Sequence, residues 1–498
     1  MCAINFERID GTNYLMEKTK SLSLNSIFYL IYNVLNVIFP FITGIYVAHI
    51  LLSFDIGRIE AAKNVASYFV ILSFLGIPTY GLREVAKTRK EQGNLNKLYS
   101  ELMVINSIST TIFSLIYFGL IFIVPEYRGD ITIYLLAGIS IVLNFLNNSW
   151  LFEGLEKFGF VSLRNLIFKV LSFTALVIFV RDKDDFLIYL IITVVGTAGN
   201  YLFNIISTPR YAKFSLKGLE LRRHLKPILF LSLVNLAIEI YSLVDITMLT
   251  FMCTKEVVAY YSYGMKIFRV TLQIVNTFTM VLVPRIALYY KEGRTEEFNA
   301  VVSKTFLVIV IISLPMVMGV WFTADYLIPA IYGDEYIRSS MVIKILCFIL
   351  AISPFGYLLG SRMLLISGHE NKMIIPVGAG AITNLIANFI LIPRLNEVGA
   401  AIASVTGEIV VMTIYLILGR KQYKLVDIFG TLWKEAVAII VMTGFLVGIS
   451  FLPTKQLVIT LIQVFGAVLI YGALLLILRE RVSLDFTKKV LGRFKKHG

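Results

Sequence analysis

Long apolar stretches constrain this chain more than any other feature. A transmembrane helix needs about 20 mostly apolar residues, and the 498-residue sequence contains fourteen such stretches. Because backbone polar groups must be satisfied inside lipid, each stretch predicts a helix rather than a strand. They lie near 25–52, 60–82, 99–124, 131–152, 159–180, 186–206, 227–252, 257–283, 300–323, 339–360, 373–392, 397–418, 433–452 and 456–478. The predicted fold class is an all-α polytopic membrane protein.

Composition agrees with this prediction and excludes several functions. Charged residues make up 16% of the chain and the mean hydropathy is +0.80, whereas soluble domains contain about 25% charged residues. A soluble enzyme is therefore excluded, and the net charge of +14 does not indicate a nucleic-acid partner. The three cysteines and four histidines are scattered, and no nucleotide-binding loop is present. We expect a transporter without catalytic residues, metal site or cofactor.

The distribution of lysine and arginine predicts the orientation of the chain in a cytoplasmic membrane. Of the 46 lysine and arginine residues, 33 lie in or next to the N-terminal segment, the even-numbered loops and the C-terminal tail. Only 8 lie in or next to the odd-numbered loops. Cytoplasmic loops carry the excess of positive charge, so both termini are predicted to be cytoplasmic. The basic segments 83–98, 207–226 and 284–304 are expected to lie on the membrane surface as amphipathic helices that contact anionic lipids.

An internal repeat is visible at an offset of 202 residues, which relates Asn33 to Asn235 and Arg83 to Arg285. Six spans per repeat predict two six-helix lobes related by a pseudo-two-fold axis along the membrane normal. Two C-terminal helices fall outside the repeat. The predicted divisions are a cytoplasmic N-terminal segment (1–24), an N-lobe (25–206), a basic linker (207–226), a C-lobe (227–418), two further spans (419–478) and a basic tail (479–498).

Polar residues recur on one face of the span predicted at 257–283. They are Ser262, Lys266, Arg269, Gln273 and Asn276. Their spacing places them on one side of a helix, and charges inside a membrane usually face a cavity or a partner. The pattern favours the wall of a water-filled, substrate-binding cavity. The alternative is a set of interhelical hydrogen bonds with a lysine that reaches toward the interface.

Two carboxyl groups in the preceding span, Glu239 and Asp245, are the expected counter-charges of Lys266 and Arg269. They predict either a structural ion-pair cluster or a site of proton or cation coupling. Further cavity candidates are Asn33, Asn36, Lys169 and Asn235.

Six segments, in order along the first 290 residues, resemble a known family. The resemblance is to the bacterial oligosaccharide flippases of O-antigen and capsule assembly, the polysaccharide branch of the multidrug/oligosaccharidyl-lipid/polysaccharide exporter superfamily. The segments are YLIYNVLNVIFPFITGIYVAHILL (29–52), YFVILSFLGIPTYGLREVAKTRK (68–90), WLFEGLEKFGFVSLRNLIFKVLSF (150–173), VDITMLTFM (244–252), YYSYGMKIFRV (260–270) and LVPRIALYY (282–290).

The resemblance implies two six-helix lobes and alternating access. The implied substrate is an oligosaccharide joined by pyrophosphate to a polyprenyl lipid, moved from the inner to the outer leaflet, and the candidate partners include a polysaccharide polymerase and chain-length machinery. At one position the chain departs from the family pattern, because His49 stands where an arginine is expected. The matching motif positions that imply a cytoplasmic gate are Arg83, Glu84, Glu153, Lys157 and Arg285.

The residues themselves support an anionic substrate. A pyrophosphate must cross about 30 Å of hydrocarbon, and fixed cations at mid-depth offset its desolvation. One alternative is an ion-coupled multidrug or small-molecule exporter of the same superfamily, which favours an acidic cavity. Another is a membrane-embedded polysaccharide polymerase, which needs a large outside loop. The longest outside loop here is only about 15 residues, at 325–339.

Overall fold

The computed structural model describes residues 28, 34–280, 282–426, 429–480 and 483–484, and every regular element among them is a helix. Ten helices are long and apolar enough to cross a membrane, or eleven if one bent pair forms a single span. The all-helical prediction is confirmed for this part of the chain. Fourteen spans stay a prediction, because the described helix Val34–Ala48 is short and one long helix contains two predicted stretches.

The described chain forms two compact units. The first contains the described residues up to Thr43 together with Ala62–Glu239, and the second contains Gly44–Ala61 together with the described residues from Ile240 onward. Helices α2 (Ser53–Phe74) and α10 (Arg222–Met252) therefore contribute residues to both units. The lobe boundaries expected from the repeat stay a prediction.

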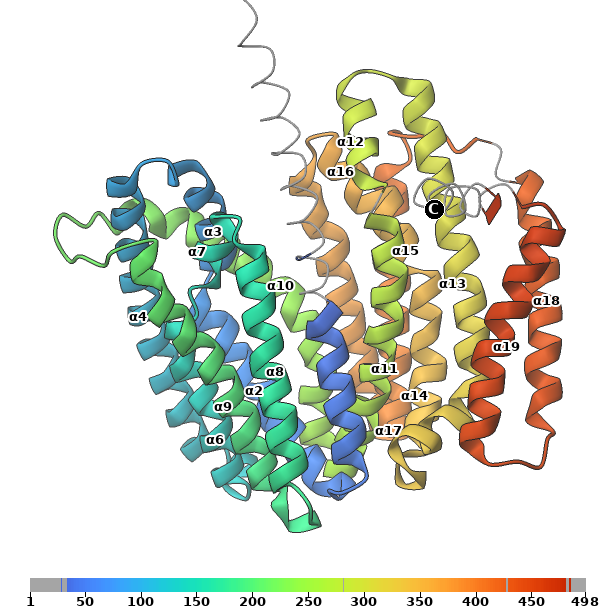
Figure 1. Cartoon of the computed structure of the whole chain (residues 1–498), viewed down its shortest axis with the longest axis horizontal. Helices are drawn as coiled ribbons and strands as arrows, with labels where there is room; N and C mark the ends of the chain where they lie inside the picture. Colours follow the sequence, from blue (N-terminus) through green and yellow to red (C-terminus); the bar gives the residue numbers. More distant parts are fainter. Residues whose placement is uncertain (1–27, 29–33, 281, 427–428, 481–482, 485–498) are drawn as a thin grey trace, which may run out of the picture. The chain divides into compact units, whose positions relative to one another are not determined.

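The first unit is a helical bundle in which several helices that are not neighbours in sequence pack against one another (Figure 1). Its apolar core surrounds Trp150, whose ring would lie 2.7 Å from a Cβ placed at Gly81. A side chain at position 81 would therefore force α3 away from α7. The remaining helices of this unit are α3 (Ile77–Thr88), α4 (Gln92–Ile123), α5 (Pro125–Arg128), α6 (Ile131–Leu143), α7 (Ser149–Gly154), α8 (Phe158–Phe179) and α9 (Phe186–Ser207), with 3-10 turns at Asn144–Leu146, Lys183–Asp185 and Thr208–Arg210.

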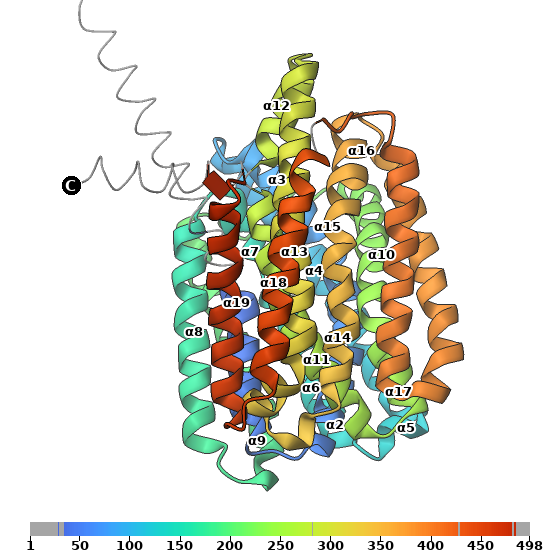
Figure 2. The same ribbon diagram turned by 90° about the vertical axis from the view of Figure 1, so that its right-hand side faces the viewer.

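The second unit contains the longest helices. Helices α18 and α19 run side by side and both pack on α13, as Figures 1 and 2 show. The helices are α11 (Lys255–Met280), α12 (Val283–Lys291), α13 (Thr295–Tyr332), α14 (Ser339–Leu346), α15 (Ser353–Gly356), α16 (Met363–Ile366), α17 (Ile374–Gly419), α18 (Phe429–Ser450) and α19 (Gln456–Ile477), with a π-helix at Tyr357–Arg362 and 3-10 turns at Asp334–Tyr336, Cys347–Ala351 and Glu370–Met373.

Helix α17 is a hairpin rather than one continuous rod. Asn396 has a non-helical backbone, with φ 50° and ψ −127°. A Cβ at Gly399 would lie 2.5 Å from the carbonyl oxygen of Leu391, and one at Gly380 would lie 3.2 Å from that of Gly407. Residues on opposite sides of the break are thus in backbone contact. The stretches predicted at 373–392 and 397–418 are the two antiparallel arms of this hairpin.

The prediction of an amphipathic helix over the basic segment 207–226 is wrong for much of that segment. An amphipathic helix was expected, but 211–221 is irregular. The Lys213 N–H donates to Asn96 Oδ1 at 2.9 Å, and the Ser215 N–H donates to Ser100 Oγ at 2.9 Å. Side chains of α4 therefore satisfy backbone groups of this loop that helical hydrogen bonds would otherwise satisfy. In 83–98 and 284–304, by contrast, most residues are helical.

The same loop-binding arrangement occurs again in the second unit. There the Lys424 N–H donates to Asn299 Oδ1 and the Val426 N–H to Ser303 Oγ, both at 2.8 Å. Asn299 and Ser303 each lie 203 residues after their counterparts on α4. The two hydrogen-bonded pairs thus recur at nearly the offset of the sequence repeat, which supports the repeat. A symmetry axis stays a prediction.

Replacing Gly399 by alanine tests the hairpin. We expect Gly399→Ala to lower the unfolding temperature of the purified protein, because its Cβ would meet Leu391 O at 2.5 Å. Gly378→Ala is the matched control in the same helix, since a Cβ there meets nothing within 4 Å and alanine favours helix over glycine by about 1 kcal/mol. Equal unfolding temperatures for the two variants would contradict the hairpin.

Candidate functional site

The polar face predicted in the eighth span lies on α11. Ser262 is buried, Lys266, Gln273 and Asn276 are half-buried, and Arg269 is exposed. The spacing of these residues on a regular helix keeps them on one side of α11. Arg269 has no hydrogen-bond or ion-pair partner among the described residues, so its guanidinium is free to bind an anion.

Lys266 has a partner that the sequence did not reveal. Its Nζ lies 3.1 Å from Oε1 of Glu60 on α2, and 4.1 Å from the centre of the Tyr263 ring. The Tyr263 hydroxyl donates to the carbonyl oxygen of Gly44 at 3.3 Å. The expected ion pair with Glu239 or Asp245 is therefore wrong for Lys266. Glu60 lies 206 positions away from Lys266 along the chain. The only feature of the sequence that could have indicated this ion pair was an acidic residue at the start of a predicted span.

Asp245 is the centre of a buried polar cluster. Its carboxylate, 3% exposed, accepts hydrogen bonds from the Tyr261 hydroxyl at 2.5 Å and from the Ser404 hydroxyl. The side-chain amides of Asn384 and Asn388 donate to its other oxygen at 3.0 and 2.6 Å. Four neutral donors from α11 and both arms of α17 thus compensate one buried carboxylate.

The ligand chemistry of this cluster is compatible with a small cation. Carboxylate, amide and hydroxyl oxygens are the ligands that hard cations prefer, and Oδ1 of Asn388 is buried without a hydrogen-bond partner. No group of three His, Cys, Asp or Glu side chains that could hold a metal occurs in the described part of the chain. The Glu239 side chain is exposed and forms no described hydrogen bond.

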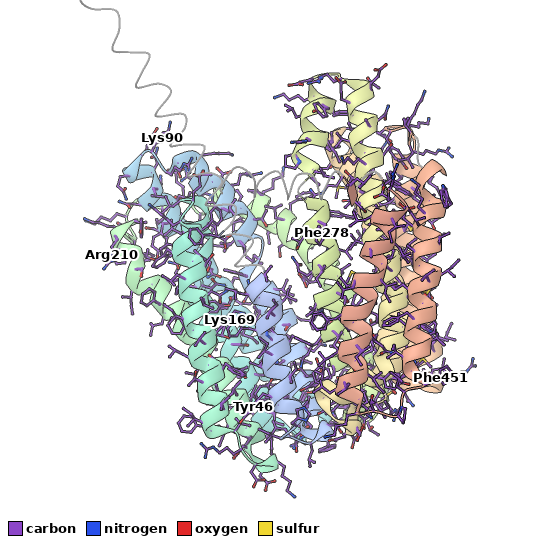
Figure 3. All side chains as sticks on the ribbon, turned by 45° about the vertical axis from the view of Figure 1, so that its right-hand side comes forward. Tyr46, Lys90, Lys169, Arg210, Phe278 and Phe451 are labelled. Atoms are coloured by element: carbon purple, nitrogen blue, oxygen red, sulfur yellow. The ribbon has the colours of Figure 1, made fainter. Side chains whose placement is uncertain are left out.

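The polar residues predicted in the first unit meet at the contact of α8 with Val34–Ala48. Lys169, on α8, donates to the carbonyl oxygen of Leu35 at 3.2 Å and lies 5.6 Å from the Phe39 ring centre (Figure 3). Asn36 accepts a hydrogen bond from Asn165 at 2.9 Å. Two other predicted site residues, Asn33 and the side chain of Asn235, lie outside the described residues.

The structure brings two of the motif residues together. On α3, the guanidinium of Arg83 donates to the carboxylate of Glu84 at 3.1 Å, and Lys87 donates to the same oxygen at 2.9 Å. All three side chains lie at the surface of the first unit, where exposed ion pairs contribute about 0–1 kcal/mol to stability.

The other motif residues have separate surroundings. Glu153, on α7, is half-buried. Lys157 is the N-cap residue of α8, and its Nζ lies 5.9 Å from the ring centre of Tyr211 in the irregular loop. Arg285, on α12, is exposed and has no described hydrogen-bond partner.

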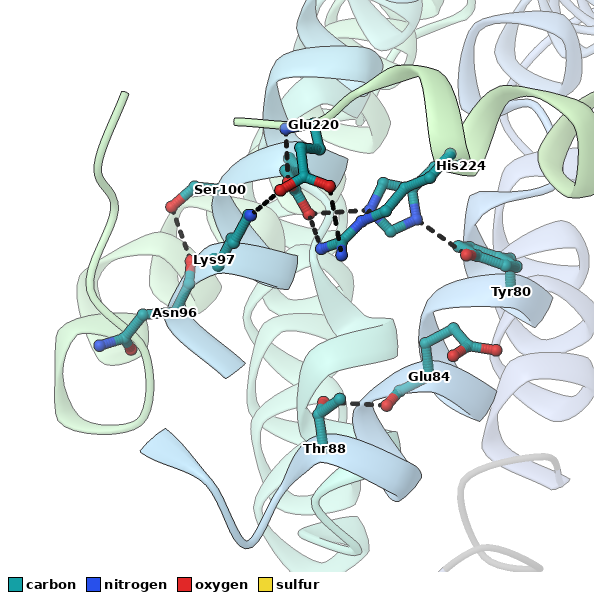
Figure 4. A network of polar contacts seen from close by, with 10 residues as sticks. Tyr80, Glu84, Thr88, Asn96, Lys97, Ser100, Glu220 and His224 are labelled. Atoms are coloured by element: carbon teal, nitrogen blue, oxygen red, sulfur yellow. Dashed lines mark hydrogen bonds and ion pairs between the residues drawn. The ribbon is translucent and has the colours of Figure 1, made fainter. Parts of the chain in front are cut away.

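A second carboxylate cluster, which the sequence did not predict, lies in the first unit (Figure 4). Glu101 on α4 is completely buried and accepts hydrogen bonds from the Glu220 N–H at 2.7 Å and from Arg223 at 2.6 Å. His224 contacts Glu101 through Nε2 and the Tyr80 hydroxyl through Nδ1, both at 2.8 Å. The cluster connects α3, α4 and the start of α10.

Charge in the adjoining loop reinforces this cluster. A hydrogen bond from Lys97 lowers the pKa of the Glu220 carboxyl, and the hydrogen bond to Glu101 raises the pKa of Arg223. The only feature of the sequence that could have indicated this cluster was Glu101 at the beginning of an apolar stretch. The hydrogen-bond partners of Glu101 could not be predicted, because they lie more than 100 positions later.

Comparison with known proteins identifies the family. Residues 22–290, more than half of the chain, match the sequence profile described as "Polysaccharide biosynthesis protein". The chain belongs to this family.

Two relatives align over most of the chain. A candidate O-antigen transporter of Shigella dysenteriae is 24% identical over 76% of this chain and 96% of its own length. A candidate O-antigen transporter of Escherichia coli K12 is 22% identical over 82% of this chain and 98% of its own length. These alignments confirm the family resemblance found in the sequence.

A solved structure supports the fold. It is the inward-facing conformation of a multidrug resistance MATE transporter of the MOP superfamily, which is 15% identical and has a TM-score of 0.59. The likeness covers 78% of this chain and 93% of that chain. The fold therefore resembles that of this transporter.

Replacing Asp245 by asparagine tests the buried cluster. An asparagine side chain turns one oxygen into an NH₂ group, so that at least one donor faces another donor. We expect the loss of roughly 2–4 kcal/mol of stability, measured as a lower unfolding temperature in detergent. The exposed Asp334→Asn is the control in the same unit. Unfolding of both variants at the temperature of the unsubstituted protein would contradict the described hydrogen bonds.

Proposed function

We propose that this protein is a flippase that moves polyprenyl-pyrophosphate-linked oligosaccharide repeat units from the inner to the outer leaflet of the cytoplasmic membrane. The movement occurs by alternating access and supplies surface polysaccharide assembly. The observation that carries the proposal is the cationic polar face of α11 in a chain of the polysaccharide biosynthesis family. Relatives described as candidate O-antigen transporters, aligned over most of their length, support it.

The two cations on α11 have different roles in this proposal. Arg269 is exposed and has no ion-pair partner among the residues that the structure describes, so it binds the pyrophosphate directly through its planar guanidinium. Lys266 is held by Glu60 at 3.1 Å, and an arriving pyrophosphate competes with that carboxylate for the ammonium. The paired form of Lys266 is therefore the resting form, and substrate releases Glu60.

Further polar residues are proposed as substrate contacts. Gln273 and Asn276 extend the α11 face and offer amide donors and acceptors to sugar hydroxyls. In the first unit, Asn36 offers an amide group and Lys169 offers an ammonium donor, and the proposal also includes Asn33 and Asn235. The motif residues Arg83, Glu84, Glu153, Lys157 and Arg285 form the proposed cytoplasmic gate.

Ion coupling is proposed at Asp245. Its burial and its five-residue hydrogen-bond cluster support this assignment, because a proton or small cation that binds there must displace donors on both arms of the α17 hairpin. Binding would then alter the packing of α17 against α10 and α11. Glu239 is the second proposed coupling residue, exposed on α10.

The alternative function is an ion-coupled exporter of drugs or other small molecules. The likeness to a multidrug transporter is 15% identical and so concerns the fold alone. Two cations on α11 favour an anionic substrate over the cationic drugs that an acidic cavity selects. The flippase is therefore the better-supported function.

The double variant Lys266→Ala with Arg269→Ala tests the substrate site. We expect it to abolish surface polysaccharide in cells, because no cation on α11 then offsets the desolvation of pyrophosphate. Membrane levels of the variant, measured by immunoblot, should match those of the unsubstituted protein. The control replaces two cations outside the apolar spans, Lys291→Ala with Arg294→Ala. Normal surface polysaccharide in the Lys266/Arg269 variant would refute the site.

Reconstituted vesicles separate the flippase from the exporter. The purified protein is expected to move a fluorescent polyprenyl-pyrophosphate oligosaccharide across the bilayer, and the Lys266/Arg269 variant is expected to lose this activity. Transport of a cationic dye in place of the glycolipid would support the exporter.

Cysteine labelling tests the proposed orientation. In a chain whose three native cysteines are replaced, Lys90→Cys is expected to resist a membrane-impermeant maleimide added to intact cells. Lys183→Cys, in a predicted outside loop, is expected to react. Both positions are exposed, so access to the outside aqueous phase decides the result. Labelling at position 90 from outside would reverse the orientation.

A further inference from the structure

A π-helix interrupts the regular backbone between α15 and α16 (Figure 1). It covers Tyr357–Arg362, and π-turns of this kind are rare and often occur at functional sites. Its four middle residues are buried, and a Cβ placed at Gly360 would collide with Tyr415 of α17. The two end residues differ from these, because Tyr357 is 42% exposed and Arg362 is half-buried. The turn therefore presents one aromatic and one cationic side chain at the surface of the second unit.

The π-turn brings these two side chains together. In a regular α-helix, residues five positions apart point in directions that differ by about 140°, whereas the i→i+5 hydrogen bonds of a π-helix place such residues nearly above one another. The guanidinium of Arg362 accordingly lies 4.4 Å from the ring centre of Tyr357 and donates a hydrogen bond to the Tyr357 hydroxyl. Tyr357 thus fixes the direction of a side chain that otherwise has many rotamers.

The charge of Arg362 is not neutralised within the described part of the chain. Its hydrogen-bond acceptor there is the neutral phenol of Tyr357, and no described carboxylate lies within ion-pair distance of its guanidinium. Its Nε is buried and has no hydrogen-bond partner among the described residues. A guanidinium keeps its charge in a protein, and a charge in an apolar span is costly without a partner. An anionic ligand is therefore favoured at Arg362.

The position of Arg362 along its span indicates a ligand at the membrane interface. The apolar helical stretch Ser339–Ile366 is long enough to cross a membrane, and it ends four residues after Arg362. Arginine side chains near the end of a span extend toward the polar headgroups. Leu365, three positions after Arg362 and on the same helical face, is 46% exposed. A cation beside an exposed apolar side chain suits an amphiphile better than a soluble anion.

We propose that Arg362 and Tyr357 bind the phosphate group of a lipid. The guanidinium donates charge-assisted hydrogen bonds to phosphate oxygens. The Tyr357 hydroxyl accepts from Arg362, so its own hydrogen can be donated to the same phosphate. Leu365 contacts the hydrocarbon chain next to the phosphate. Two kinds of lipid carry such a group at the interface, an anionic phospholipid and a polyprenyl pyrophosphate. The site lies on a different helix from the polar face of α11 and does not depend on the proposed flippase function.

Lipid binding to the purified full chain tests the site. All variants are made in the Lys266→Ala/Arg269→Ala background, so that these two cations of α11 contribute no binding. The probes are dioleoylphosphatidylglycerol and farnesyl pyrophosphate, each titrated in detergent and counted on the protein by native mass spectrometry. We expect Arg362→Gln to weaken the binding of at least one probe by about tenfold or more, because charge-assisted hydrogen bonds are lost. Arg294→Gln is the control, since Arg294 is already paired with Glu297 at 2.7 Å.

Tyr357→Leu separates a positioned guanidinium from a general effect of charge. This variant keeps Arg362 but removes the ring and the hydroxyl that hold it, so binding is expected to weaken, although less than in Arg362→Gln. Unchanged binding of both probes in Arg362→Gln, or an equal loss in Arg294→Gln, would overturn the proposal. A loss confined to farnesyl pyrophosphate assigns the site to a lipid-linked pyrophosphate, and a loss confined to phosphatidylglycerol assigns it to a membrane phospholipid. A loss of both supports recognition of the phosphate group that they share.

Discussion

The absence of water from the bilayer core is the constraint on which the rest of this structure depends, because a polar group there must find its partner within the protein. Several half-buried or buried charges reflect this. Lys266 is paired with Glu60, Lys169 bonds a backbone carbonyl, and Asp245 accepts four hydrogen bonds. These contacts fix which faces of α2, α10, α11 and α17 meet within the second unit. Polar residues that look expendable in sequence therefore determine the packing of the helices.

Periodicity within one helix was predictable from the sequence, whereas partners across helices were not. The helical face of α11 follows from the spacing of Lys266, Arg269 and their neighbours, which needs only the geometry of an α-helix. The pairing of Lys266 depends on which helix packs beside α11, and that contact spans 206 positions. Asp245 could be recognised as a charge in an apolar span, but its amide partners on α17 lie about 140 positions later. The hydrophobic pattern carries no information on such distant contacts.

The irregular loop 211–221 shows a different limit of sequence reasoning. A segment that mixes basic and apolar residues forms an amphipathic helix only if the backbone satisfies its own hydrogen bonds. Here Asn96 and Ser100 of α4 accept hydrogen bonds from two N–H groups of the loop. An irregular backbone therefore loses few hydrogen bonds relative to a helix. The same pair of residue types, Asn299 and Ser303, binds the second loop. This repeated loop contact depends on two polar residues four positions apart. A search for apolar patterns does not detect such a pair.

Asp245 shows how structural compensation constrains a buried ion site. Its carboxylate is surrounded by neutral donors, so the protein itself compensates its charge, and a coupling ion must compete with those donors. An ion at Asp245 would therefore act by displacing existing contacts. Such an arrangement suits a site that must release its ion during each transport cycle.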